Sequence, residues 1–246
     1  MSKNAQRSGF EQLLYTYARP LVKKTFFTTA RPTEATRWLY RAVFDAQFSV
    51  RESYEWARRA LVATPVFLSR CASYGERIVV DRIPYIQGPV RIELGSDIRI
   101  SGKIDISSSS HGNPVFKVGN GVFLGHQCTF AIAERIEIGD FASMGAGTHV
   151  SDTEGHKHYN PGKPIWEVPA GDADIAPVII EDGVQIGRMC TILKGVRIGA
   201  RSVVGARSVV RSNIPPDSVV MGNPARVVKR MTPDAPKADA SEPEKS

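Results

Sequence analysis

Residues 180–210 read IEDGVQIGRMCTILKGVRIGARSVVGARSVV, and this stretch decides the fold. An aliphatic residue returns at every sixth position from Ile180 to Val210, and the fifth place of each unit is small or aliphatic, as at Cys190 and Ser202. A period of six is neither the helical period nor the alternation of a simple strand. It does fit a coil of short strands joined by tight turns, in which equivalent aliphatic side chains stack inside the coil about 4.8 Å apart.

The same spacing can be traced towards the N-terminus. The earlier inward positions are Leu94, Ile100 and Ile106, then Val118, Leu124 and Phe130, then Ile138, Met144 and Val150. With three units per turn, the repeat predicts a mainly β domain over residues 79–230 with about five coils. The rhythm breaks near residues 107–117 and again over residues 151–179, so we expect an insertion at each place.

Residues 1–78 follow a helical pattern instead. Apolar residues have helical spacing over residues 10–21, and Thr33 is suited to cap a second helix. Residues 49–52 read SVRE, a capping box that would open a third helix. The pair Thr64–Pro65 predicts a last short helix that Gly75 would close.

The ends of the chain differ in charge and in expected order. The formal net charge is +7, and residues 1–75 carry all of the excess, with 12 Lys and Arg against five Asp and Glu. Residues 231–246 are rich in Pro, Ala and charge with little to bury, so we expect a disordered tail.

Two interpretations of the basic N-terminal region stay open. Lys23, Phe27, Arg37, Trp38 and Tyr40 would suit peripheral contact with an anionic membrane. The same aromatic residues would also suit a cap over the end of the coil, which a solenoid requires, and we favour the cap. No recognised nucleic-acid-binding motif accompanies the charge, so we expect no nucleic acid partner.

The sequence also predicts a cellular compartment. The first residues, MSKNAQRSGFEQLL, lack the apolar core of a signal peptide, and the longest apolar run, ALVATPVFL, is too short to cross a bilayer. We therefore expect a cytoplasmic protein. Cys71, Cys128 and Cys190 show no paired spacing, which argues against a disulfide framework or a cysteine zinc site and favours packing roles.

Two motifs extend the argument beyond the repeat. The loop SDTEGH (151–156) and the exit NIPPDSVVMGNPARVVKR (213–230) resemble the hexapeptide-repeat acyltransferases, and within them the maltose, galactoside and polysaccharide O-acetyltransferases. The likeness covers roughly residues 80–230. It implies a left-handed parallel β-helix, a homotrimer of triangular prisms, acetyl-CoA bound in a groove between prisms, and a loop histidine as base.

The resemblance assigns the base to His156, which would take the proton of an attacking hydroxyl and return it to the CoA thiolate. Histidine suits this task because its unperturbed pKa is about 6.5. Asp152 is the favoured residue to orient His156, with Glu154 as the alternative, and a supporting role for His149 or His158 stays open. A backbone N–H near residues 144–147 would hold the developing oxyanion.

Carried over by position, the CoA-binding places are Arg188, Ala206, Arg211, Ser212, Arg226 and Lys229. Four of these six are cationic, as a ligand with several phosphate charges favours. Two departures bear on the acceptor: the chain has GHQ at residues 125–127 in place of an asparagine, and QIG at residues 185–187 in place of a Trp-Ile-Gly run. The acceptor is therefore not expected to be a simple mono- or disaccharide.

We therefore interpret the chain as an acetyl-CoA-dependent O-acetyltransferase of polysaccharide biosynthesis, acting on a sugar, polysaccharide or glycolipid precursor without a metal. One alternative is a non-catalytic scaffold or binding trimer of the same repeat. Another is a zinc enzyme like the carbonic anhydrases of this fold, with His126, His149 and His156 as ligands.

Overall fold

The computed structural model describes residues 31–108, 112–155, 162, 164 and 171–231. Its contacts divide into two compact units, Met1–Ser53 and Tyr54–Ser246. The helix expected over residues 10–21, the basic and aromatic residues 23–27 and all but the first residue of the expected tail lie outside the described residues. The second unit contains the repeat.

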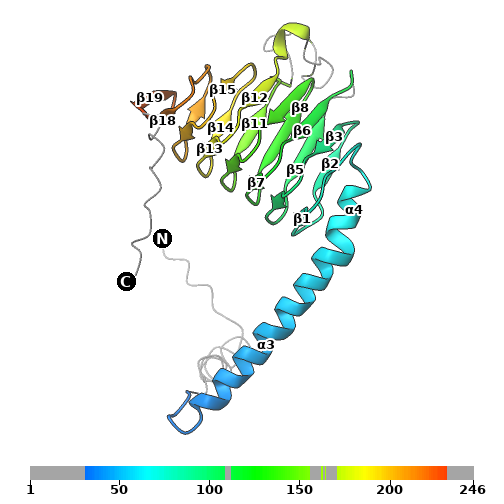
Figure 1. Cartoon of the computed structure of the whole chain (residues 1–246), viewed down its shortest axis with the longest axis vertical. Helices are drawn as coiled ribbons and strands as arrows, with labels where there is room; N and C mark the ends of the chain where they lie inside the picture. The colour runs from blue at the N-terminus through cyan, green and yellow to red at the C-terminus, as the bar shows by residue number, and fades with distance from the viewer. Residues whose placement is uncertain (1–30, 109–111, 156–161, 163, 165–170, 232–246) are drawn as a thin grey trace, which may run out of the picture. The chain divides into compact units, whose positions relative to one another are not determined.

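Residues 79–222 form a solenoid of parallel strands that visits three sheets in turn, and the last strand of the chain then pairs antiparallel at the end of the first sheet (Figure 1). The first sheet contains β1 (Val79–Val80), β4 (Arg99–Ile100), β7 (Phe123–Leu124), β10 (Ser143–Met144), β13 (Gln185–Ile186), β16 (Val203–Val204), β18 (Ser218–Gly222) and β19 (Ala225–Arg230). The second contains β2 (Tyr85–Gln87), β5 (Asp105–Ser108), β8 (Thr129–Ile132), β11 (His149–Ser151), β14 (Thr191–Ile192) and β17 (Val209–Val210). The third contains β3 (Arg91–Leu94), β6 (Val115–Val118), β9 (Arg135–Ile138), β12 (Val178–Ile180) and β15 (Arg197–Ile198).

The coil is longer than the sequence predicts. The described strands make about six turns, because β1 and β2 precede Leu94 of β3, the first recognisable inward position, and β18 adds a strand after Val210. The first two strands were missed because prolines at positions 84 and 89 interrupt the period, and the inward residue of β2, Ile86, is only partly buried. The mainly β, coiled architecture is confirmed.

The six-residue period sets the interior of the solenoid. Ile180, Ile186, Ile192, Ile198, Val204 and Val210 are each at most 5 % exposed. Strand pairing is in register, so Ile186 lies beside Met144 on one side and Val204 on the other. The interior also contains an aromatic pair, since the rings of Phe116 and Phe130 pack at an interplanar angle of 44° with their centroids 4.6 Å apart. The expected inward positions are therefore confirmed.

Two of the small fifth residues of the repeat, Cys128 and Cys190, lie inside the corner between the first and second sheets. Cys128 Sγ donates to the Gly145 carbonyl one coil later, at 3.4 Å, and Cys190 Sγ donates to the Gly205 carbonyl at 3.2 Å. Burial raises the pKa of Cys128 to about 11. All three cysteines are free, so these two corner thiols have the packing role that the sequence predicts.

The N-terminal helices differ from expectation. A single helix, α3 (Arg37–Arg58), runs through the place where a third helix was expected to begin. Ser49 does not cap a helix there, because its hydroxyl donates back to the Asp45 carbonyl at 2.8 Å inside α3. At the start of the segment the Thr33 N–H donates to Thr36 Oγ1 at 2.9 Å and the Thr33 carbonyl accepts the Arg37 N–H at 2.9 Å, so Thr33 takes part in the turn before α3 through its backbone.

The helical segment continues without a break through a π-helical turn, η2 (Arg59–Ala63), into α4 (Thr64–Leu68), which has Pro65 in its first turn. Gly75 does not close α4, since its N–H donates to the carbonyls of Leu94 and Gly95 and it belongs to the first coil. α4 ends at Leu68 instead.

Residues of η2 and α4 pack on the N-terminal end of the solenoid. Ala63 and Phe67 are at most 1 % exposed, and Phe67 belongs to the solenoid core. Trp38 and Tyr40 belong to the other compact unit, and Phe27 lies outside the described residues, so the expected aromatic cap stays a prediction. Within the part of the chain that the structure describes, no helix has the length and apolar character needed to cross a membrane.

Candidate functional site

The long insertion leaves the solenoid at the corner between the second and third sheets, after β11 and before β12. Its two ends pair with each other: Thr153 forms an antiparallel bridge with Ile175, and the Glu154 N–H donates to the Asp174 carbonyl at 3.1 Å. The short 3-10 helix η4 (Asp172–Asp174) precedes the returning arm. We call residues 151–155 and 171–177 the stem of the loop.

The stem is tied to the next coil by Lys194, a residue that sequence analysis did not single out. Its ammonium group lies 3.0 Å from Glu154 Oε1 on the outgoing arm and donates to the Ala173 carbonyl, at 3.0 Å, on the returning arm. The Gly195 N–H also donates to the Ala176 carbonyl at 2.9 Å. The base of the loop is therefore held in one position, although no sequence motif marks Lys194.

Asp152 anchors the stem to the preceding coil. It is fully buried, and its carboxylate accepts the backbone N–H groups of Ala133, Glu134 and Arg135 at 2.6–2.8 Å. Burial raises the pKa of Asp152, and the three N–H donors act in the opposite direction. Both oxygens are thus occupied by backbone donors, and Asp152 determines where the loop leaves the solenoid.

The anchor predicts a stability effect. Asp152→Asn replaces one accepting oxygen by an amide that faces backbone donors, so we expect the free energy of unfolding to fall by about 2–3 kcal/mol. Asp174→Asn is the matched control, because the Asp174 carboxylate accepts a single described backbone N–H, that of Gly171. Urea denaturation measures both, and equal stability of the two variants would contradict the anchoring role.

The histidines of the region are described in part. His156 and His158 lie outside the described residues, so the expected base has no described position. His149 lies on β11 with a half-buried ring, and its Nδ1 is 2.7 Å from Thr129 Oγ1 on β8. Burial lowers the pKa of His149. His126 lies at the corner before β8, where its carbonyl accepts the Gly147 N–H.

The described geometry bears on two expectations, the zinc site and the oxyanion donors. Among the described residues no group of three His, Cys, Asp or Glu side chains is arranged to hold a metal ion, but His156 of the proposed zinc set lies outside them. The expected oxyanion donors are partly occupied, because the N–H groups of Gly145 and Gly147 bond the carbonyls of Ile186 and His126. These two N–H groups are therefore not available to a substrate.

The expected CoA-binding residues fall at two places. Arg188 and Ala206 lie on neighbouring coils at the corner between the first and second sheets, where the Arg207 N–H donates to the Arg188 carbonyl at 2.8 Å. Arg226 and Lys229 lie on β19, paired with Met221 and Val219 of β18 at the C-terminal end of the first sheet.

Arg211 and Ser212 follow β17 and lie at the corner where the chain leaves the second sheet for the third. All six side chains belong to exposed residues. The structure thus brings four of the six to the end and edge of the first sheet and leaves Arg211 and Ser212 at another corner.

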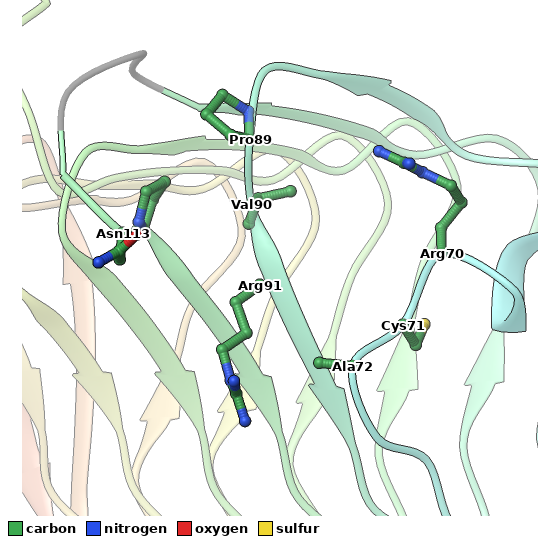
Figure 2. A pocket seen from close by; sticks show the side chains of 8 residues that line it. Arg70, Cys71, Ala72, Pro89, Val90, Arg91 and Asn113 are labelled. Carbon is green, nitrogen blue, oxygen red and sulfur yellow. The ribbon is translucent and has the colours of Figure 1, made fainter.

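A cavity of about 640 Å³ lies at the N-terminal end of the solenoid (Figure 2). Arg70 and Cys71 line it after α4, together with Val90, Arg91 and Asn113. The Arg91 guanidinium is bonded to Glu93, and Figure 2 shows it directed away from Pro89. None of the site residues expected from the sequence lines this cavity.

Comparison with known proteins supports the repeat directly. Residues 177–212 match a family model described as bacterial transferase hexapeptide (six repeats). The chain is 47% identical over 55 residues to 2,3,4,5-tetrahydropyridine-2,6-dicarboxylate N-acetyltransferase of Staphylococcus aureus strain JH9. That match covers 22% of this chain and 23% of the relative, so the shared segment is about a quarter of either protein.

Solved structures resemble the chain over a longer range. AntD, an N-acyltransferase from Bacillus cereus solved with dTDP and 3-hydroxybutyryl-CoA, has a TM-score of 0.56 at 21% identity and covers 69% of this chain and 88% of its own. The polysialic acid O-acetyltransferase OatWY has a TM-score of 0.50 at 21% identity, with coverage of 71% and 88%. At this identity the likeness shows the fold, which is the left-handed parallel β-helix.

Proposed function

Because residues 177–212 match the bacterial transferase hexapeptide model, we propose that this chain is a hexapeptide-repeat transferase and that it transfers an acetyl group from acetyl-CoA to a hydroxyl of a sugar, polysaccharide or glycolipid precursor. The proposal specifies three things: an oxygen atom as acceptor, acetyl-CoA as donor, and His156 as general base. The proposal includes a homotrimer, whose neighbouring prisms would form the groove for CoA.

The observation that carries the proposal is the loop stem. A solenoid needs no insertion for stability, yet this one interrupts its fourth turn between β11 and β12 and fixes both ends of the inserted segment. Asp152 holds the stem from the coil before, and Lys194 holds it from the coil after. Residues that bind or catalyse are often found on loops that a rigid scaffold positions.

In the proposed reaction the acceptor oxygen attacks the thioester carbon, and His156 removes its proton as the new bond forms. The proton then passes from His156 to the CoA sulfur as the carbon–sulfur bond breaks. Asp152 contributes by positioning the stem four residues before His156, since backbone donors already occupy its carboxylate. A neutral imidazole near pH 7 suits this role.

The acyl donor is proposed to bind along the end of the first sheet. Arg188 and Arg226 supply positive charge there for the phosphates, and Ala206 leaves room for the ligand beside the backbone. Lys229, Arg211 and Ser212 are proposed for the same ligand, the last two from the corner that follows β17.

Calorimetric titration of the full chain with CoA tests the donor site. We expect Arg188→Glu and Arg226→Glu each to raise the dissociation constant about tenfold, because each loses a charge-assisted contact and adds repulsion. Arg70→Glu is the control, since Arg70 is also exposed but lies at the other end of the solenoid, beside α4. Equal weakening in all three variants would contradict the proposed location.

The titration, together with metal and product analysis, separates the proposed activity from the scaffold and zinc-enzyme alternatives. A wild-type protein that forms trimers in light scattering but does not bind CoA would favour the non-catalytic scaffold. Stoichiometric zinc in the purified protein would favour the metal alternative. Product analysis by mass spectrometry on hydroxyl and amino acceptors decides between oxygen and nitrogen transfer.

A further inference from the structure

A column of polar side chains crosses the outer face of the second sheet next to the loop stem. Strand pairing sets Asp105 beside Thr129, Thr129 beside His149, and His149 beside Thr191. Their neighbours on the same strands alternate with them and point into the core, as Ile106, Phe130 and Val150 do. The four residues therefore share one outer surface of the solenoid, in adjacent coils.

Thr129 fixes the ring of His149. The 2.7 Å contact between Thr129 Oγ1 and His149 Nδ1 directs Nδ1 towards the preceding coil, so Nε2 lies on the other side of the ring. Among the described residues no hydrogen bond to Nε2 is present. His149 lies two residues before the stem begins its turn at Ser151, whose hydroxyl donates to the Thr153 carbonyl. The ring is therefore held in place, with a nitrogen available, at the foot of the loop.

Asp105 lies on the other side of Thr129 in the column. Its Oδ1 atom is buried and, within the described parts of the chain, has no hydrogen-bond partner, although Lys103 Nζ lies 3.6 Å away as an ion pair. The nearest hydroxyl in the column belongs to Thr129. The Thr129 oxygen can accept the proton of His149 Nδ1–H, and in that tautomer the lone pair of the imidazole lies on Nε2.

We propose that His149 and Thr129 form a subsite that binds the acceptor, in which His149 Nε2 accepts a hydrogen bond from a hydroxyl or amino group of that molecule. The inference rests on the proposed function, because the acceptor must reach the foot of the loop that carries His156. The ligand class is a polyhydroxylated or amino-bearing molecule.

The surroundings of His149 favour a neutral, accepting ring. Burial lowers the pKa of His149, so the imidazole is uncharged at neutral pH. The strands on either side, β8 and β14, present threonines to it. The charge of Asp105 in the column is paired with Lys103, and the Asp152 carboxylate is occupied by backbone donors.

The test separates acceptor binding from folding and from use of the donor. We expect His149→Asn, which can keep the contact with Thr129 but has no atom at the Nε2 position, to raise the KM for the acceptor about tenfold. The KM for acetyl-CoA should not change. His149→Gln, whose amide oxygen reaches the Nε2 position, should recover most of the loss.

Thr129→Val should raise the acceptor KM in the same direction, and Thr129→Ser should restore it. Thr191→Val is the matched control, because Thr191 flanks His149 on the other side of the column without a described bond to it. ¹⁵N NMR of the imidazole adds a readout that needs no activity: Thr129→Val should shift the Nδ1 resonance and Thr191→Val should not.

The possible results distinguish the acceptor subsite from the proposed function. An active wild type whose His149→Asn variant keeps its acceptor KM would overturn the subsite and leave the proposed function standing. Equal loss for acceptor and acetyl-CoA would also overturn it, because a distorted fold explains that pattern. A wild type that binds CoA but transfers acetyl to no hydroxyl or amine would overturn the proposed function and the subsite together.

Discussion

Replacement of His156 by alanine is expected to lower the rate of acetyl transfer by a factor of about 10² to 10⁴, the usual contribution of a positioned general base. The variant should bind acetyl-CoA as the wild type does, since the base acts on the acceptor and not on the donor phosphates. Release of CoA, followed by chromatography at saturating acetyl-CoA, measures the rate.

The control for His156 is His158→Ala, a histidine two residues further along the same loop. We expect His158→Ala to stay within a few-fold of the wild type, so the pair tests position rather than histidine content. A His156→Ala enzyme with the wild-type rate on its acceptor would refute the assignment of the base. A loss of equal size in both variants would instead point to the loop as a whole.

The second large effect concerns the spacing of the coils. Gly187 lies at the corner before β14, and a Cβ added there would lie 2.5 Å from the Ala206 N and 2.7 Å from its Cα. Both atoms are backbone of the next coil, so the coil cannot yield as a side chain would. We expect Gly187→Ala to lower the free energy of unfolding by about 3 kcal/mol, measured by denaturant unfolding.

Gly205→Ala is the matched control at the equivalent corner of the following coil. There the added Cβ would meet the Cβ of Met221 at 3.0 Å, so a shift of a few tenths of an ångström relieves the contact, whereas the backbone atoms at Gly187 lie well inside contact distance. We expect a loss of less than about 1.5 kcal/mol. Comparable losses at Gly187 and Gly205 would show that backbone contact between coils is not what the glycine protects.

The repeat was predictable because its cause is local. Each aliphatic residue points into its own coil and stacks on the equivalent residue of the neighbouring coil. The six-residue period therefore identifies the buried positions directly from the sequence. Ile186 and Val204 illustrate this, since both were identified by spacing and both are at most 5 % exposed. The first two strands, β1 and β2, escaped detection because nearby prolines hide the period and Ile86 is only partly buried.

The helical region was less predictable for a related reason. The SVRE sequence at residues 49–52 satisfies the pattern of a capping box, but Ser49 donates its hydroxyl to the Asp45 carbonyl within a continuous helix. A serine can cap a helix or bond backward inside one, and the choice depends on whether the chain before it is already helical. A short motif does not contain that information.

By itself the sequence determined the coil, its inward residues and the place where the loop interrupts it, because periodic burial can be read along a chain. Tertiary structure decided the roles of Asp152, Lys194 and Thr129, whose partners lie one coil away at the backbone of Ala133, the carboxylate of Glu154 and the ring of His149. One circuit of the solenoid separates such partners by about 20 residues or more, as Asp152 and Ala133 show. Only the stacking of coils brings them within bonding distance, so no local pattern could reveal them.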